Sequence, residues 1–295
     1  MIYLDPKSDI AFKKLFGSAA HKNILMSFLN SVLGRQIGEL IIDVVMNDPN
    51  NVAETPLSKM SIVDVRCTDQ HDNQYIVEMQ IVTQKNYAAR AQYYSSLALS
   101  RQLASGENYE KLVPVIFIGV LDFSLFRTKK YISHHFLLDD ETYEHELEHL
   151  EFHFIELPKF NKELDAGSTV LDKWIYFLKN AEKLQQIPVT LKEPAITQAF
   201  DILAQSNWSK AELTAYDRYL DSIRSYFSQL ETAEAIGEEK GRQKGKAEGL
   251  EEGRQEGEIK GRLDIAKQLL DILDVATIAQ KTGLTIEQVE ALKKG

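Results

Sequence analysis

The spacing of apolar residues changes along this chain, and the change separates a first part with strands and helices from a second part that is helical throughout. Helical spacing holds from Ile10 to Leu33, with a break near Gly17. Asp5 and Pro6 are suited to begin this segment as N-cap and first helical residue, and Gly34 is suited to end it. The sequence therefore predicts that the first domain starts with helix.

Runs of apolar and β-branched residues predict the strands of one sheet. These runs cover residues 40–45, both sides of a polar cluster at 69–73, and residues 113–121, 131–138 and 150–157. The polar cluster is rich in turn formers, so the two runs beside it are expected to pair as a β-hairpin. With a loop at 47–58 and a further helix at 87–103, the order of elements predicts an α/β fold, in which helices cover the faces of a mixed sheet.

The chain from residue 162 to about residue 233 carries three apolar clusters at helical spacing, which predict a helical subdomain. Glycine then recurs at every fourth residue from Gly237 to Gly261, between acidic and basic residues. Each glycine costs a helix roughly 1 kcal/mol relative to alanine, although ion pairs three or four residues apart offset part of this cost. We interpret this charged segment as an extended, marginal helix, which serves either for close backbone approach in a homo-oligomer or as a tether.

The last residues predict a small helical hairpin that is similar to a helix-turn-helix. Gly283 supplies the turn, Thr285 the N-cap of the second helix, and Ala279 and Val289 the packing between the helices. Within the second helix, basic residues appear only near its end, at Lys293 and Lys294, so a hairpin that caps the chain is favoured over a DNA reader. The expected organisation is a first domain over residues 1–160, a helical subdomain over 161–235, the charged segment over 236–263 and the hairpin over 264–295.

Composition places the chain among soluble globular proteins, because 44% of its 295 residues are hydrophobic and 26% are charged. Its net charge of −10 argues against a strongly basic DNA coat but leaves room for a local basic patch. The single cysteine, Cys67, forms no internal disulfide, which favours a reducing cytoplasm. No apolar run approaches the ~20 residues of a membrane span, so no membrane partner is expected.

Two acidic residues stand inside the strands of the predicted hairpin, where a charge is costly unless something pairs with it. If the turn is centred near His71, Asp64 falls opposite Glu78. Directly opposed Cβ atoms lie roughly 4.5–5.5 Å apart, and two carboxylates at that distance repel each other unless a cation lies between them. A hard divalent cation with oxygen ligands, Mg²⁺ or Mn²⁺, fits this pair best.

The order of Asp64 and then Glu78-Met79-Gln80 resembles the D…(D/E)-x-K signature of the restriction-endonuclease-like superfamily, with Gln80 where the superfamily usually has lysine. This variant is similar to the Rpn family of recombination-promoting nucleases, also described as transposases. Other stretches fit the same family: Asp5-Pro6-Lys7, Asp9 with Phe12-Lys13, Phe28-Leu29-Asn30, Gly106 with Tyr109, and Glu156-Leu157-Pro158-Lys159-Phe160.

The resemblance implies a restriction-endonuclease-like core and the activity of a metal-dependent DNA endonuclease that promotes DNA recombination. It implies that Asp64, Glu78 and the backbone carbonyl of Met79 hold Mg²⁺ or Mn²⁺, and that Gln80 orients the attacking water. Glutamine offers only amide donors and one acceptor, so it cannot supply the positive charge of a lysine.

Several other residues are candidates to supply charge at this site. Lys13 and Lys85 are candidates to contact DNA, and either one is also a candidate for the missing positive charge. Arg90, on the helix at 87–103, either reaches a DNA phosphate or is a partly solvated arginine. Asp9 and Lys13 share a helix face and form either a solvent ion pair or part of the metal cluster. Without a metal, Asp64 and Glu78 would instead form salt bridges to Arg66 or Arg90.

A second class of function is a non-catalytic protein that uses a nuclease fold to bind DNA or protein through its helical tail. The glutamine at position 80, the acidic balance and the recurring glycines leave room for it. Metal binding at the hairpin separates the two classes, because a site without activity need not hold a cation between its carboxylates.

Overall fold

The computed structural model describes residues 1–48, 50–51 and 61–294. These residues form two compact units, Met1–Asp221 and Ser222–Gly295. The predicted loop at 47–58 lies mostly outside the described residues. A two-stranded ladder of β2 (Asn50–Asn51) and β3 (Ser61–Ile62) flanks the gap.

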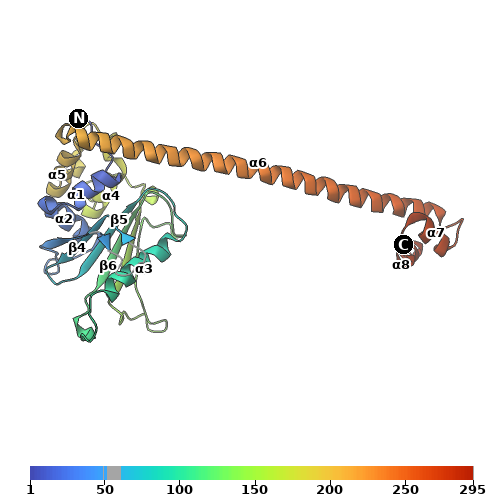
Figure 1. The fold of residues 1–295 in the computed structure, drawn as a ribbon, viewed down its shortest axis with the longest axis horizontal. Helices are drawn as coiled ribbons and strands as arrows, with labels where there is room; N and C mark the ends of the chain where they lie inside the picture. The colour runs from blue at the N-terminus through green and yellow to red at the C-terminus, as the bar shows by residue number, and fades with distance from the viewer. Residues whose placement is uncertain (49, 52–60, 295) are drawn as a thin grey trace. The chain divides into compact units, whose positions relative to one another are not determined.

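A six-stranded mixed sheet forms the centre of the first unit, as predicted (Figure 1). Its strands, in spatial order, are β1 (Val44–Asn47), β4 (Val65–Asp69), β5 (Gln74–Gln80), β6 (Val115–Leu121), β8 (Leu150–Glu156) and β7 (Ile132–His135). The three central strands β5, β6 and β8 run parallel, and every other neighbouring pair is antiparallel.

Helices cover both faces of this sheet (Figure 1). One face packs against α1 (Asp9–Phe16), α2 (Lys22–Leu33), α4 (Val170–Asn180) and α5 (Pro194–Leu203), and the other against α3 (Tyr87–Ser100). Short 3-10 turns connect these elements at Ala19–His21, Tyr109–Lys111, Leu157–Lys159, Ala181–Lys183, Val189–Leu191 and Gln205–Asn207. Strand β6 is apolar at every position because Ile116 and Ile118 face the first layer while Val115 and Phe117 face α3.

Several predicted boundaries were wrong, among them the end of the strand expected at 131–138, which stops at His135. The first helix begins at Asp9, not at Asp5-Pro6, because the Ser8 side chain accepts a hydrogen bond from the Ala11 N–H and so caps the helix there. The first strand is Val44–Asn47 rather than 40–45, since its bounds are set by pairing with β4. Helix α3 ends at Ser100, three residues before the predicted end.

The helices after residue 160 share a core with the residues before it. One buried cluster contains Phe16 and Phe28 from the N-terminal helices together with Trp174, Phe177 and Phe200 from α4 and α5. The compact unit accordingly extends to residue 221. The division of the chain into four segments stays a prediction.

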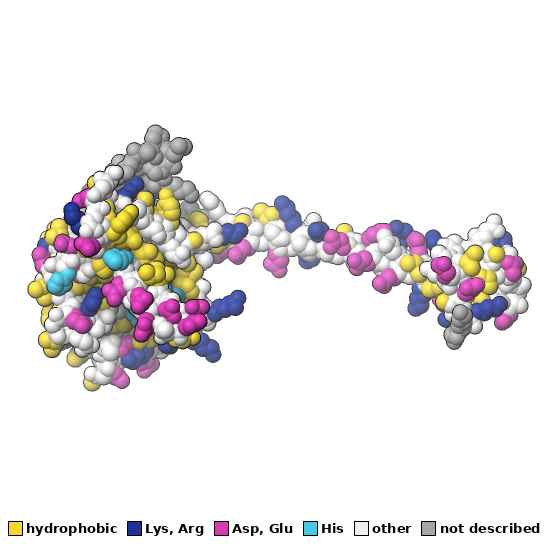
Figure 2. All heavy atoms as spheres, turned by 90° about the horizontal axis from the view of Figure 1, so that it is seen from below, with side chains coloured by type: hydrophobic (Ala, Val, Ile, Leu, Met, Phe, Trp, Pro, Cys, Tyr) yellow, Lys and Arg dark blue, Asp and Glu magenta, His cyan; other side chains and the backbone are white. Residues whose placement is uncertain are grey.

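The second unit contains most of α6 (Lys210–Leu269), followed by α7 (Val275–Thr282) and α8 (Ile286–Lys294). The segment with glycine at every fourth residue is helical, and Figure 2 shows acidic and basic side chains interspersed along α6. Gly283 adopts a φ of +72° at the predicted turn, and Thr285 caps α8 by accepting from the Gln288 N–H over 3.2 Å. Among the described residues, no helix combines the length and the apolar character of a membrane span.

Candidate active site

The β4–β5 hairpin sets the register of the two candidate carboxylates. Pairing runs from Thr68 opposite Gln74 to Val65 opposite Val77, so the next facing positions are Asp64 and Glu78. This is the register predicted from a turn at His71. Asp64 itself stands one residue before β4 begins, at the open end of the hairpin.

The turn of the hairpin is held by one buried carboxylate, which explains why the register is fixed. The Asp69 side chain accepts hydrogen bonds from the N–H groups of His71 and Asn73 over 2.8 and 3.0 Å, and from the Tyr75 hydroxyl over 2.8 Å. Asp72 adopts a left-handed φ of +66°, which aspartate tolerates better than most residues. A one-residue slip would break this set of contacts and reverse the faces of β5.

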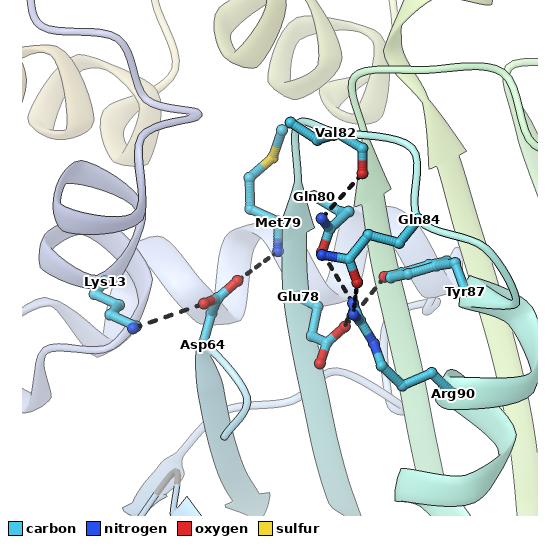
Figure 3. A network of polar contacts seen from close by, with 9 residues as sticks. All are labelled: Lys13, Asp64, Glu78, Met79, Gln80, Val82, Gln84, Tyr87 and Arg90. Atoms are coloured by element: carbon cyan, nitrogen blue, oxygen red, sulfur yellow. Dashed lines mark hydrogen bonds and ion pairs between the residues drawn. The ribbon is translucent and has the colours of Figure 1, made fainter. Parts of the chain in front are cut away.

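Asp64 lies against the edge of β5 and close to α1 (Figure 3). Its Oδ2 accepts a hydrogen bond of 2.7 Å from the Met79 N–H, and its Oδ1 is 3.8 Å from the Lys13 Nζ. The Lys13 ammonium is also 2.7 Å from Asp9 Oδ1, so helix α1 brings both of its candidate residues to the hairpin. The side chain of Asp64 is 18% exposed, whereas that of Asp9 is 43% exposed.

The Glu78 side chain contacts residues of α3, and only 7% of it is exposed. Its Oε2 lies 3.3 Å from the Tyr87 hydroxyl, which donates to it, and 3.5 Å from the Arg90 Nη2. Gly119 stands opposite Glu78 in the parallel pair of β5 and β6. A Cβ at Gly119 would lie 3.1 Å from the Tyr87 hydroxyl, so this glycine provides the space in which Tyr87 reaches the carboxylate.

Gln80 lies on the same face of β5 as Glu78, and both the oxygen and the nitrogen of its side-chain amide form hydrogen bonds. The Arg90 Nη2 donates to Gln80 Oε1 over 2.9 Å, and Gln80 Nε2 donates to the Val82 carbonyl over 3.0 Å (Figure 3). Arg90 also donates to Gln84 and stacks on the Tyr87 ring, 4.9 Å from its centroid. The cation nearest to Gln80 is thus provided by α3.

Burial makes the two carboxylates hard to ionise. Burial raises the pKa of Asp64 to about 7; the Met79 N–H and Lys13 oppose this rise, while the charges of Asp9 and Glu78 add to it. Burial also raises the pKa of Glu78, against the opposing effects of Arg90 and Tyr87. The neighbouring cations therefore compensate the negative charge only in part, and a further cation would stabilise both ionised carboxylates.

The oxygen donors around Asp64 fit a hard divalent cation. Along β5, the Gln80 carbonyl accepts from the Asp122 N–H on the β6 side, whereas the Met79 N–H points to Asp64. Because the two polar groups of one strand residue point the same way, the Met79 carbonyl also faces the Asp64 side, beyond the start of β4. Within the described residues, no three His, Cys, Asp or Glu side chains are placed to hold a metal ion. Two carboxylates, one carbonyl and water remain as the set, which suits Mg²⁺ because that ion keeps several waters.

The structure brings together most of the residues that the sequence singled out. Asp9, Lys13, Asp64, Glu78, Met79, Gln80 and Arg90 all belong to the contact network of Figure 3 or touch it. Lys85 does not: it is exposed and forms no ion pair with any residue that the structure describes. Tyr87 was missed, because its position at the start of the helix expected at 87–103 carries no signal for a contact with Glu78. Of the two arginines expected to pair with the carboxylates, Arg90 does so, through Glu78.

Comparison with known proteins supplies an independent finding. A family model described as PD-(D/E)XK nuclease family transposase matches residues 6–233. No curated protein and no solved structure matches the chain. The matched range contains the whole sheet, the helices on both of its faces and the candidate carboxylates.

Proposed function

We propose a metal-dependent DNA endonuclease activity for this chain, which belongs to the family of PD-(D/E)XK nuclease transposases. The observation that carries the proposal is the position of Asp64 opposite Glu78 at the open end of the β4–β5 hairpin, with the Asp64 carboxylate 2.7 Å from the Met79 N–H. Two acidic side chains and a backbone carbonyl that faces the Asp64 side form the donor set of a hard divalent cation.

Asp64, Glu78 and the Met79 carbonyl would hold the cation, Mg²⁺ or Mn²⁺. When bound, such an ion supplies a water of lowered pKa and stabilises the negative charge that develops on the phosphate. Glu78 would keep its contacts to Tyr87 and Arg90, which fix the carboxylate. Asp9 would stay outside the set of direct ligands and hold Lys13 beside Asp64.

Gln80 would orient the attacking water. Its amide is fixed by Arg90 and by the Val82 carbonyl, which leaves one N–H and one oxygen lone pair free to contact a water. Arg90 would supply the positive charge that glutamine lacks, because its guanidinium lies 2.9 Å from Gln80 and 3.5 Å from Glu78. This assignment replaces Lys13 and Lys85 as candidates for that charge. Cuts made in this way would serve DNA recombination.

The alternative is a nuclease-fold protein that binds DNA or protein without cutting. The observation that favours it is Gln80 itself, because the superfamily usually has a lysine at that position. Under this alternative, Arg90 would serve as a permanent partner of Glu78 and no metal would be needed.

Plasmid cleavage in Mg²⁺, Mn²⁺ or Ca²⁺ tests the proposal. We expect cutting in Mg²⁺ or Mn²⁺ by the wild type and at least a hundredfold loss in Asp64→Asn and in Glu78→Gln. Asp43→Asn is the matched control, since Asp43 carries the same carboxylate on an exposed site before β1. Absence of cutting by pure wild-type protein, together with absence of metal binding in calorimetry, would favour the alternative.

A further inference from the structure

The segment after β6, residues 122–130, leaves the sheet beside the candidate active site. Strand β6 runs parallel to β5 with Leu121 opposite Gln80, and the Asp122 N–H donates to the Gln80 carbonyl over 2.9 Å. The next aromatic residue, Phe123, packs edge to face on Tyr87 with 6.2 Å between the ring centroids. The segment therefore starts at the carboxyl ends of β5 and β6, where Gln80 and Glu78 also lie.

An ion pair on the first residue of the segment ties it to the N-terminal turn. Lys7 Nζ lies 3.0 Å from Asp122 Oδ2 and 3.9 Å from Asp5 Oδ2, and its side chain is largely buried. Burial by itself would lower the pKa of Lys7, but Asp5 and Asp122 raise it, so the ammonium stays charged. The Asp5-Pro6-Lys7 stretch thus holds the start of the segment at residues 122–130, and none of its residues is a proposed metal ligand.

A second, deeper contact fixes the middle of the segment. Glu156 Oε1 accepts from the N–H groups of Leu125 and Phe126 over 2.5 and 3.1 Å. Lys159 Nζ donates to Glu156 Oε2 over 2.6 Å and to the Phe126 carbonyl over 2.7 Å. Glu156 is only 1% exposed, so Glu156 and Lys159 form a buried ion pair. Both side chains of this pair also form hydrogen bonds with the backbone of residues 122–130.

Three cations follow directly on this fixed backbone. Arg127, Lys129 and Lys130 are exposed, and none of them has an acidic partner within salt-bridge distance among the residues that the structure describes. The chain as a whole carries a charge of −10, whereas these three cations, a few residues after the end of β6, have no paired acidic group among the described residues. Two charged anchors hold the backbone from which these cations project.

We propose that Arg127, Lys129 and Lys130 form a phosphate-binding ridge that contacts the backbone of the DNA substrate beside the cleavage site. This inference rests on the proposed function and names a contact surface for its substrate. Lysine and arginine supply the contacts to DNA phosphates, and such contacts fix the position of the duplex without reading its sequence. With this ridge, a protein of net negative charge can bind a polyanion, because the attraction between its cations and the DNA phosphates acts at one end of the strands only.

Binding of a fluorescent DNA duplex, measured over a range of salt concentrations, tests the ridge. The test variant is K129Q/K130Q. The matched control is K22Q/K111Q, which removes two lysines near the starts of β1 and β6, at the other end of the strands. Each variant is made in a D64N background so that the duplex stays uncut. We expect K129Q/K130Q to bind at least tenfold more weakly at low salt and to lose about 2 from the slope of log affinity against log salt, since each phosphate contact contributes about 0.9.

The control is expected to stay within about twofold of its parent in affinity. R127Q alone should lower the slope by about 1, and it offers an independent check if the double variant fails to fold. Equal effects of ridge and control variants on affinity, or no binding by the parent, would overturn the ridge. Plasmid cleavage by the wild type is scored separately. If the wild type cleaves DNA but the ridge variants bind as well as the control, the nuclease proposal holds and the ridge proposal fails. If the ridge variants alone lose binding and the wild type does not cleave, the ridge proposal holds and the nuclease proposal fails.

Discussion

The Arg90 guanidinium donates a hydrogen bond of 2.9 Å to the side-chain oxygen of Gln80. Gln80 stands where related nucleases usually have lysine, and a neutral amide cannot stabilise developing negative charge as an ammonium does. Arg90 comes from a different element, α3, yet its cationic group lies beside both Gln80 and Glu78. The pair thus places a cationic group beside a neutral amide on β5.

Arg90→Gln should lower the rate of DNA cleavage by about 10²–10³-fold, since it removes the charge but keeps hydrogen-bonding groups. Adding Gln80→Lys to that variant should recover most of the rate, because the lysine returns a charge to the same side of β5. Single-turnover cleavage measures both. Wild-type rates in Arg90→Gln would show that the charge has no part in the reaction.

Mg²⁺ or Mn²⁺ should raise the melting temperature of the wild type, because a ligand that binds only the folded state stabilises it. At ten times the dissociation constant the gain is about 1.4 kcal/mol. Asp64→Asn and Glu78→Gln should lose this response, and Asp43→Asn should keep it. Thermal unfolding in EDTA and in metal provides the comparison; an equal shift in all four proteins would indicate metal binding elsewhere.

Stability should fall as the pH rises through the titration of Asp5. Burial raises the pKa of Asp5 to about 6, so between pH 4 and 6 the unfolded chain ionises this group while the folded protein keeps its proton. The favourable contribution is therefore complete below about pH 4 and is lost above about pH 6. Relative to Asp5→Asn, which does not titrate, the wild type should lose up to about 3 kcal/mol over this range. Urea unfolding at several pH values measures the difference, and parallel curves would contradict it.

Glu156→Ala should destabilise the first unit by about 3–5 kcal/mol, because it leaves the Lys159 ammonium and the N–H groups of Leu125 and Phe126 without their acceptor. Glu156→Gln keeps an acceptor oxygen and should cost less. Chemical denaturation of the two variants gives the values. A loss below about 1 kcal/mol in Glu156→Ala would mean that residues 122–130 are not held by this contact.

Replacing Gly245, Gly249 and Gly253 with alanine should stabilise α6, since an added Cβ at each meets nothing within 4 Å beyond the nearby backbone of its own helix, and alanine is favoured by roughly 1 kcal/mol per site. Circular dichroism during heating should show helix that persists to higher temperature. The same variant separates the two proposed roles of this segment. Light scattering should show an unchanged assembly if the segment is a tether, and dissociation if copies of the chain approach each other at the glycines.

Features that depend on residues close together in the chain could be predicted from the amino-acid sequence. The turn formers around His71 fixed where the hairpin folds back, and the alternation of side chains then placed Asp64 opposite Glu78. Gly34 and Gly283 marked helix ends because only a left-handed conformation fits there, and both have positive φ. A few neighbouring residues and the fixed periods of strand and helix are enough to specify these features, so the sequence by itself determined them.

Contacts between distant elements were decided only by the tertiary structure. The pairing of Arg90 with Gln80 depends on how closely α3 packs on the sheet, which Gly119 permits, and no periodicity reports that distance. The same holds for Glu156, which reaches across 31 residues of chain to the Leu125 N–H. Such contacts arise when packing of the whole core brings separate segments together, because the free energy that places them is spread over many buried residues rather than written in a local motif.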